Sequence, residues 1–336
     1  MYIFREIDSA KRTKITMNTA KIISKMKKLQ VPICTDCTFS RLTTFGVGGT
    51  IEVTTFPQSI NQLVRVVKYL QRHKIPFYLL GKGSNVLASD SNFNGVVICT
   101  KDLCQVQADG VFVTAQCGTP TAKVAQLCVA KGLGGCEFFG CLPASVGGVV
   151  CCNAGCFGQC VENVIYSVTV LYKGKVKTLK PSQCNFSYRN SIFKNGNHVL
   201  LHATFRLQKS TPFDVSCKIQ QFKRQKCQTQ PLGQKSAGCV LCNNQFAVSQ
   251  LIDQAGLKGY RMGGAQVSKK HAGFVINIDK ATAKDIYLLV RHVKQVLLQR
   301  YNVTCNVELN LVNFTEEKHD LFAIDQTGNS QNAPSS

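Results

Sequence analysis

Residues 142–158, LPASVGGVVCCNAGCFG, place Gly147, Gly148, Gly155 and Gly158 within seventeen positions of small, mostly apolar neighbours. Glycine lets a backbone approach another group closely and adopt dihedral angles that other residues avoid. This density therefore indicates main chain packed against something flat or bulky. Ordinary tight turns are the structural alternative, and the segment alone does not exclude them.

A second glycine-rich loop, GKGSN at 81–85, follows the apolar run PFYLL at 76–80, for which we expect a strand. Backbone amides exposed in such a loop can bind phosphate. The Rossmann fingerprint is excluded, because Val86 stands where a third glycine is needed and the strand-like VLAS stands where a helix is needed. Two such loops in one chain favour a dinucleotide held by main-chain groups.

Periodicity outward from these loops predicts alternating helices and strands. Ser59 and Gln62 form a capping box before one helix, Thr119 caps a second helix that Gly132 ends, and Thr282 caps a third. Expected helices cover 59–73, 119–132, 213–228, 246–256 and 282–301, and expected strands cover 76–80, 110–115, 164–172, 175–179 and 199–207.

The segment VTCNVELNLV at 303–312 alternates strictly between apolar and polar residues and predicts one continuous strand. Glu308 lies on its polar face. From the pattern alone, a solvated carboxylate is the better interpretation of Glu308.

Composition sets the class of protein. With 336 residues, the chain is long enough for two or three domains. It lacks an apolar run of about 20 residues and a secretory signal, so we expect a cytoplasmic protein without membrane insertion. Both polar ends, 1–30 and 315–336, are expected to be loosely held.

Most of the 18 cysteines are expected to be buried free thiols, because a reducing compartment keeps them unpaired. Two CxxC pairs, Cys34 with Cys37 and Cys239 with Cys242, lie too far apart for a zinc ribbon, so we predict no metal. The net charge of +22 suits either nucleic acid or anionic small molecules. Without a nucleic-acid-binding motif, anionic ligands are favoured.

Seven segments in order resemble the UDP-N-acetylenolpyruvoylglucosamine reductase family over about residues 43–312. They are TTFGVGG (43–49), LGKGSNVLASD (80–90), GCEFFGCLPASVGGVVCCNAGCFG (135–158), FSYRNS (186–191), QPLGQKSAGCVLCNN (230–244), LIDQAGLKGYRMGGAQVSKKHAGFVIN (251–277) and ATAKDI (281–286).

The resemblance implies an α+β fold with a two-subdomain FAD-binding module, like that of the vanillyl-alcohol-oxidase flavoproteins, and a C-terminal α+β substrate domain. The implied boundaries are an N-terminal extension at 1–30, the FAD module at 31–210 with subdomains at 31–100 and 101–210, the substrate domain at 211–302, a strand carrying Glu308 at 303–314, and a tail at 315–336. The short stretch between Arg189 and Gln230 resembles type II members.

The implied reaction has two halves. NADPH reduces FAD, and the flavin then passes a hydride to UDP-N-acetylglucosamine enolpyruvate, giving the UDP-N-acetylmuramate of peptidoglycan synthesis. By position, Arg189 and Glu308 match catalytic residues that stabilise the carboxylate end of the substrate. Cys239 stands where many relatives carry a proton-donating serine. A thiol, with a reference pKa of about 8.5, is mostly protonated at pH 7 and donates more readily than a hydroxyl.

The other implied ligands follow the same segments. FAD is expected at Gly81, Lys82, Gly83, Ser84, Asn85, Ser145, Gly147, Gly148, Asn153 and Gly155, and substrate at Tyr188, Asn243 and His271. Cys242 and Asn244 depart from a lysine and a proline common in the family, which affects the expected diphosphate contacts. Near Glu308, Asn306 stands where relatives often carry another acidic residue. A monomer is expected.

Two other functions stay open at this point. A flavin oxidase of the same superfamily would consume dioxygen with an alcohol or sugar substrate and without NADPH. A basic nucleic-acid-binding protein would be colourless and would bind DNA or RNA with strong salt dependence.

Overall fold

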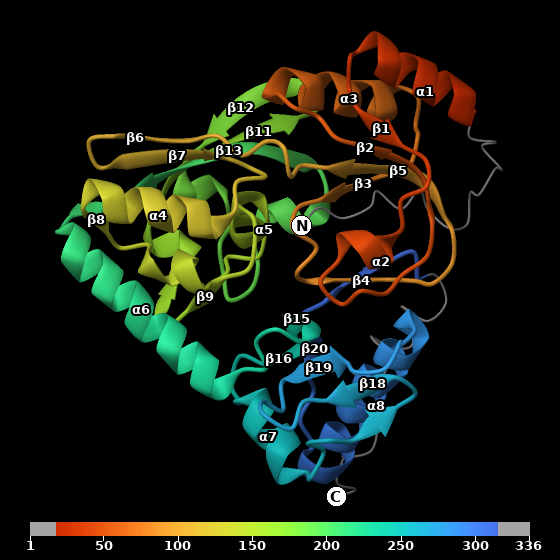
Figure 1. The fold of residues 1–336 in the computed structure, drawn as a ribbon, viewed down its shortest axis with the longest axis vertical. Coiled ribbons are helices and arrows are strands. Elements are labelled where there is room, and N and C mark those ends of the chain that lie inside the picture. The colour runs from red at the N-terminus through yellow and green to blue at the C-terminus, as the bar shows by residue number, and fades with distance from the viewer. Residues whose placement is uncertain (1–17, 315–336) are drawn as a thin grey trace, which may run out of the picture. The chain divides into compact units, whose positions relative to one another are not determined.

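The computed structural model describes residues 18–314, which divide into two compact units (Figure 1). Within the described residues, unit 1 comprises 18–37, 51–82 and 93–226, and unit 2 comprises 38–50, 83–92 and 227–314. The chain thus passes several times between the units, and the loop at 81–85 is one of the crossings.

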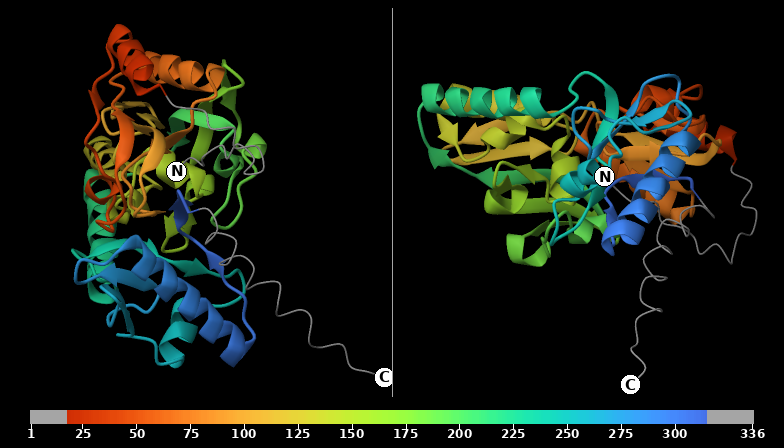
Figure 2. Two further views of the ribbon diagram at one scale, coloured as in Figure 1. Left: turned by 90° about the vertical axis from the view of Figure 1, so that its right-hand side faces the viewer. Right: turned by 90° about the horizontal axis from the view of Figure 1, so that it is seen from below.

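The first sheet of unit 1 has the order β1-β2-β5-β3, from Ile33–Cys34, Ile51–Thr55, Phe93–Cys99 and Phe77–Leu80. Strands β2 and β3 both run parallel to β5. Helices α1 (Thr19–Lys28) and α3 (Ile60–Arg72) lie side by side in Figures 1 and 2 and bury apolar side chains in the same core as this sheet.

Helix α3 begins as predicted, because the Ser59 hydroxyl accepts a hydrogen bond of 3.2 Å from the Gln62 amide. The Gln62 side chain accepts a hydrogen bond from the Gln58 amide rather than from the Ser59 amide. Only one of the two hydrogen bonds of the expected capping box therefore forms. The expectation of a loosely held N-terminus up to residue 30 is wrong for α1, since Ile22 and Met26 are buried in the core. Residues 1–17 and 315–336 lie outside the described part of the chain.

The second sheet of unit 1 is antiparallel, with the order β12-β11-β13-β7-β6. Its strands are Lys175–Leu179, Ile165–Tyr172, His198–Arg206, Phe112–Gln116 and Val106–Asp109. Around it are α4 (Thr121–Lys131), α5 (Val146–Cys151), α6 (Pro212–Thr229), the 3-10 turns Glu137–Cys141, Val161–Asn163, Pro181–Gln183 and Ile192–Asn195, and the short strand pairs β8 (Leu133–Gly134) with β14 (Gln208–Lys209) and β9 (Gly155–Cys156) with β10 (Gln159–Cys160).

Helix α4 ends at Gly132 in a left-handed conformation, as predicted, but Thr119 does not cap it. Pro120 occupies the capping position, and the Thr119 hydroxyl donates to the Gln105 carbonyl at 3.0 Å. A proline at this position presets the backbone, because its φ is fixed near the helical value.

Unit 2 is built on the sheet β15-β19-β18-β17, from Lys235–Cys239, Phe274–Asn277, Ala265–Val267 and Arg261–Met262. The long helix α8 (Ala283–Tyr301) packs on this sheet, and α7 (Val248–Gln254) contacts α8 (Figure 1). The unit also holds α2 (Phe39–Leu42), β4 (Val86–Ala88), β16 (Leu241–Cys242), β20 (Asn306–Val307) and β21 (Asn310–Val312).

The start of α8 confirms the predicted cap. Thr282 and Asp285 form the reciprocal capping box, and Asp90 accepts from the amides of Ala283 and Lys284 at 3.0 and 3.2 Å. Asp90 thereby fixes the segment after GKGSN onto the helix N-terminus, where a carboxylate is favoured by the helix dipole.

The continuous strand expected over 303–312 is wrong. Instead β20 pairs antiparallel with β16, and β21 pairs parallel with β4. The chain changes partner between them, at Glu308 and Leu309, so strict alternation ends there. Among the described residues, no helix combines the length and apolar character needed to cross a membrane.

Candidate functional site

Four predicted cofactor-binding residues line one open pocket in unit 1. They are Gly81, Ser145, Gly147 and Gly148, and the same pocket is lined by Leu79, Leu80, Thr100 and Cys117. The two glycine-rich segments therefore meet, although they lie some sixty positions apart in the sequence.

Packing explains why this pocket needs glycine. A Cβ atom on Gly81 would lie 2.2 Å from the Ser145 hydroxyl oxygen, and one on Gly147 would lie 3.0 Å from the Cys117 carbonyl oxygen. The Gly147 amide donates to that same carbonyl at 2.7 Å. The glycines let two main-chain segments meet closely at this pocket, and their lack of side chains suits a flat ring or a diphosphate, so these residues fit FAD.

Cys117 forms the apolar part of this wall. Burial raises the pKa of its thiol to about 12, so the thiol stays neutral at physiological pH. It behaves as a small hydrophobe beside the glycines.

Asn153 joins the glycine-rich segment to the turn that carries Arg189. Its Nδ2 donates to the Ser187 carbonyl at 3.1 Å and to the Glu162 carboxylate at 3.2 Å, while its Oδ1 accepts from the Glu162 amide at 3.0 Å. The Ser191 hydroxyl donates to the Cys151 carbonyl at 2.6 Å on the other side of the turn. Asn153 is thus a structural link between the two segments.

Arg189 is held within this turn in a left-handed conformation, with φ of 55°. Its Nη1 donates to the Gly155 carbonyl at 3.3 Å, and its guanidinium carbon lies 5.4 Å from the centre of the exposed Tyr188 ring. Gly155 leaves no space for a side chain, because a Cβ would lie 2.1 Å from the Gln159 carbonyl oxygen. The predicted residues Asn153, Gly155, Tyr188 and Arg189 therefore form one cluster.

The loop at 81–85 is divided between the units: Gly81 and Lys82 belong to unit 1, and Gly83, Ser84 and Asn85 belong to unit 2. Gly83 has φ of 69°, and a Cβ there would lie 2.3 Å from the Leu42 carbonyl oxygen. Thr44 holds the unit 2 part, since its amide donates to the Gly83 carbonyl at 3.1 Å and its hydroxyl donates to the Ser236 carbonyl at 2.6 Å.

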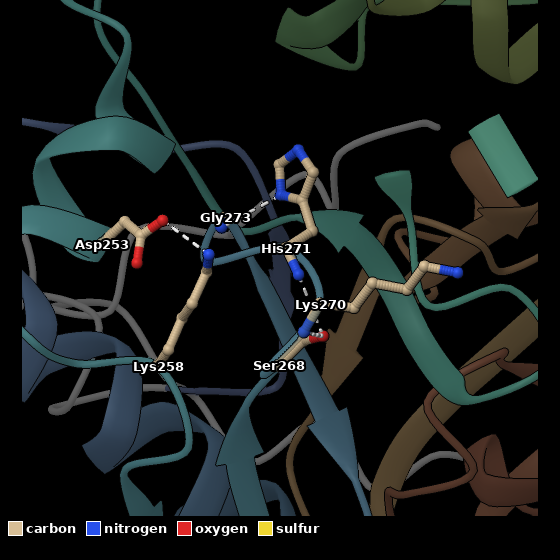
Figure 3. Close-up of polar contacts among 6 residues, drawn as sticks. All are labelled: Asp253, Lys258, Ser268, Lys270, His271 and Gly273. Carbon is tan, nitrogen blue, oxygen red and sulfur yellow. Dashed lines mark hydrogen bonds and ion pairs between the residues drawn. The ribbon is translucent and has the colours of Figure 1, made fainter. Parts of the chain in front are cut away.

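Cys239 and His271 flank Gly273 in unit 2. A Cβ on Gly273 would lie 3.1 Å from the His271 Cε1 and 3.2 Å from the Cys239 Sγ. Figure 3 shows the His271 ring with Nδ1 turned toward the Gly273 amide, which donates to it at 3.1 Å. The Lys270 side chain extends away from that ring in the same view.

Burial, partly offset by a backbone hydrogen bond and assisted by the nearby Lys258 ammonium, lowers the pKa of His271. The imidazole is therefore neutral at pH 7, and because Nδ1 accepts a hydrogen bond, its proton sits on Nε2. An imidazolium would favour a thiolate at Cys239, and the neutral ring exerts no such influence.

Glu308 is bonded to the same region through its main chain. Its amide donates to the Val240 carbonyl at 2.9 Å, and its carbonyl accepts from the Asn85 Nδ2 at 3.0 Å. Asn310 donates through both its amide, at 3.1 Å, and its Nδ2, at 2.9 Å, to the Asn85 carbonyl. Unit 2 therefore brings Cys239, Glu308 and Asn85 together.

Asn243 is engaged within its own loop. Its Nδ2 donates to the Thr304 carbonyl at 2.8 Å, and its Oδ1 accepts from the amides of Gln245 and Phe246 at 2.6 and 3.0 Å. In this arrangement the side chain stabilises the connection after β16.

Sequence reasoning missed three residues that position this site. Thr44 joins the phosphate loop to the Cys239 strand, Gly273 makes room for Cys239 and His271, and Asn310 supports Glu308. Thr44 and Gly273 lie inside motifs that were recognised, but their partners come from distant segments. Among the described residues, no group of three or more histidine, cysteine or acidic side chains is arranged to hold a metal ion.

Two family models match the chain. Residues 51–180 match an FAD binding domain, and residues 230–312 match the C-terminal domain of UDP-N-acetylenolpyruvoylglucosamine reductase.

Curated and solved UDP-N-acetylenolpyruvoylglucosamine reductases are similar to this chain over most of its length. The UDP-N-acetylenolpyruvoylglucosamine reductase of Clostridium novyi is 38% identical over 272 residues, which cover 80% of this chain and 89% of that protein. The Shouchella clausii protein is 36% identical, covering 78% of this chain and 85% of that protein. The crystal structure of the Thermus caldophilus reductase superposes with a TM-score of 0.71 at 28% identity, covering 84% of this chain and 98% of that one.

Proposed function

Because the chain belongs to the UDP-N-acetylenolpyruvoylglucosamine reductase family, we propose that Arg189, Cys239 and Glu308 are its catalytic residues. The chain is an FAD-dependent oxidoreductase of the UDP-N-acetylmuramate dehydrogenase type, with an FAD-binding domain, and acts with NADPH in peptidoglycan precursor synthesis. The observation that supports the residue assignment best is the main-chain hydrogen bond between Glu308 and Val240, the residue that follows Cys239.

FAD, when bound, would supply the route by which a hydride from NADPH reaches the enolpyruvyl group. Gly81, Ser145, Gly147 and Gly148 are proposed to hold it, because they line one pocket at which the two glycine-rich segments meet. Lys82, Gly83, Ser84 and Asn85 complete the proposed phosphate loop, and the cluster around Asn153 and Gly155 supports it.

Cys239 is proposed to donate the proton from Sγ to the substrate carbon next to the carboxylate. A general acid must carry its proton when substrate binds, and the neutral His271 ring places no positive charge nearby that would favour the thiolate. General acids of this kind contribute about 10² to 10⁴ in rate.

Arg189 and Glu308 are proposed to act at the substrate carboxylate. The guanidinium of Arg189 offers paired N–H donors that match a carboxylate, and it stabilises the charge that develops when hydride arrives. Glu308 is half-buried and its backbone is fixed on both sides, so its carboxylate is presented from a rigid position. Tyr188 and His271 are proposed to contact the substrate directly. Asn243 is proposed to contribute to substrate binding through the loop that its side chain stabilises.

We propose that the substrates are NADPH and UDP-N-acetylglucosamine enolpyruvate, and that the protein works as a cytoplasmic monomer. Both substrates are water-soluble nucleotides, which supports this location. Nucleic acid is not a proposed partner.

An anaerobic flavin titration tests this function. NADPH should bleach the yellow flavin, and UDP-N-acetylglucosamine enolpyruvate should restore its colour. A protein that takes up no FAD, or a reduced flavin that the enolpyruvyl sugar nucleotide leaves bleached, contradicts the proposal. Rapid dioxygen consumption with an alcohol or sugar in place of NADPH would identify an oxidase.

A further inference from the structure

Two cysteines outside the proposed catalytic site form a close pair in unit 1. Cys34 lies in β1 opposite Thr54 of β2, and Cys37 lies three residues after the end of this strand. The Cys37 thiol donates to the Cys34 sulfur at an Sγ–Sγ distance of 2.7 Å, and the Cys34 thiol donates to the Asp36 carboxylate at 2.8 Å. Both cysteines are partly exposed to solvent.

This combination of proximity and access is what thiol–disulfide exchange requires. A second pair, Cys128 with Cys136, shows the contrast within the same unit. Its Sγ–Sγ distance is 3.3 Å, but both thiols are buried. The hydrogen bond that the Cys136 thiol donates to the Cys128 sulfur, together with burial, holds the pKa of Cys136 well above its usual range. The sulfur atoms are therefore close together in both pairs, but only the Cys34 and Cys37 thiols are accessible to solvent.

We propose that Cys34 and Cys37 form a reversible dithiol modification site that reacts with low-molecular-weight disulfides of the glutathione type. The Cys37 thiolate attacks one sulfur of the small disulfide, which forms a mixed disulfide and releases one small thiol. The Cys34 thiolate then attacks the Cys37 sulfur, which forms the Cys34–Cys37 bond and releases the second small thiol. The cysteine pair loses two electrons and two protons, and the small disulfide takes up both.

Asp36 determines the order of these steps. Its carboxylate accepts from the Cys34 thiol, and this bond, followed by the bond from Cys37, raises the pKa of Cys34 to about 11. Cys34 therefore stays protonated at neutral pH and is the slower nucleophile. Cys37 is left as the first attacking group, and Cys34 as the resolving one.

Peptide-level mass spectrometry of the full-length, FAD-loaded protein tests the site. Reduced protein is incubated with oxidised glutathione at pH 7.5, and remaining thiols are alkylated. The peptide with Cys34 and Cys37 should lose the mass of two hydrogen atoms, as expected for a disulfide. The oxidised fraction of this pair should be at least about tenfold larger than that of Cys128 and Cys136. Dithiothreitol should restore the mass of the reduced peptide.

Single substitutions distinguish closure from simple surface oxidation. In Cys34→Ser, Cys37 should accumulate as the glutathione mixed disulfide, whereas in Cys37→Ser, Cys34 should remain largely unmodified. Asp36→Asn should speed closure about 3- to 10-fold at pH 7.5, because it weakens the bond that keeps Cys34 protonated. The proposal is overturned if the wild-type pair stays reduced, if it stops at a mixed disulfide, or if the buried pair closes first.

Discussion

The amide of Glu308 donates a hydrogen bond of 2.9 Å to the carbonyl of Val240, the residue next to Cys239. This bond ties the C-terminal end of the described chain to the strand that carries the proposed proton donor. It makes the position of Glu308 depend on the same local structure as that of Cys239. Changes near either residue should therefore affect one step of the reaction.

Gly273→Ala should slow that step. The new methyl group would lie about 3.2 Å from the Cys239 sulfur and 3.1 Å from the His271 ring, so both must move. Misplacing a catalytic group slightly costs about 10- to 100-fold, and we expect a loss of that size in flavin reoxidation by substrate. Stopped-flow absorbance measures it, and flavin reduction by NADPH should change little. An unchanged reoxidation rate would show that this glycine does not position the thiol.

Asn310→Ala should loosen the segment that presents Glu308. The substitution removes the side-chain bond to the Asn85 carbonyl and leaves the main-chain bond in place, so kcat should fall about 3- to 30-fold while the protein still folds. Asn313→Ala is a matched control, because its Nδ2 bonds the Ser91 and Asn92 carbonyls further along the chain. Equal effects of the two substitutions on kcat would contradict the positioning role of Asn310.

Gly81→Ala should abolish FAD binding by closing the pocket. Its methyl group would meet the Ser145 hydroxyl at 2.2 Å, and adding Ser145→Ala removes that oxygen. We expect the double variant to regain the thermal stability lost by the single one, yet to bind FAD at least about 10-fold more weakly than wild type. Flavin fluorescence measures the affinity. Full recovery of FAD affinity in the double variant would place the cofactor elsewhere.

Asp285 should make folding stability depend on acid pH. Desolvation raises its pKa, but hydrogen bonds from the Thr282 and Gly264 amides outweigh this, and the net pKa lies below its ordinary value of 3.8. A depressed carboxyl pKa stabilises the fold above the unfolded value, and the contribution is lost as pH falls from about 4 through the lower folded pKa.

Comparing Asp285→Asn with wild type tests this contribution. The substitution should lower the thermal midpoint at pH 6, and the difference should shrink toward pH 3. A constant difference across that range would rule out the titration.

The sequence predicted the parts of the fold that local pattern controls. Ser59, Gly132 and Thr282 mark helix ends because caps are local. The ten helices and strands expected outside 303–312 appear within a few residues, as α3, α4, α6, α7, α8, β3, β7, β11, β12 and β13. The ordered segments also identified the family and FAD correctly, since seven matches in sequence order are far more specific than one glycine loop.

Long-range pairing limited the remaining predictions. Alternation over 303–312 could not show that Asn306 pairs with Cys242 while Asn310 pairs with Val86. The interruption of the strand at Glu308 could therefore not be predicted. The same holds for Thr44, whose hydroxyl reaches Ser236 across 192 positions. The left-handed conformation of Arg189 could not be predicted either, because the hydrogen bonds that hold its turn come from Asn153 and Gly155 in another segment.

The central claim is that the Cys239 thiol supplies the proton after hydride transfer. Single-turnover reoxidation of the anaerobically reduced flavin by UDP-N-acetylglucosamine enolpyruvate tests it in wild type, Cys239→Ser and Cys239→Ala. We predict that alanine lowers the rate about 10² to 10⁴-fold, that serine retains part of it, and that reduction by NADPH is unaffected in both. Reoxidation of the alanine variant at the wild-type rate would contradict the claim.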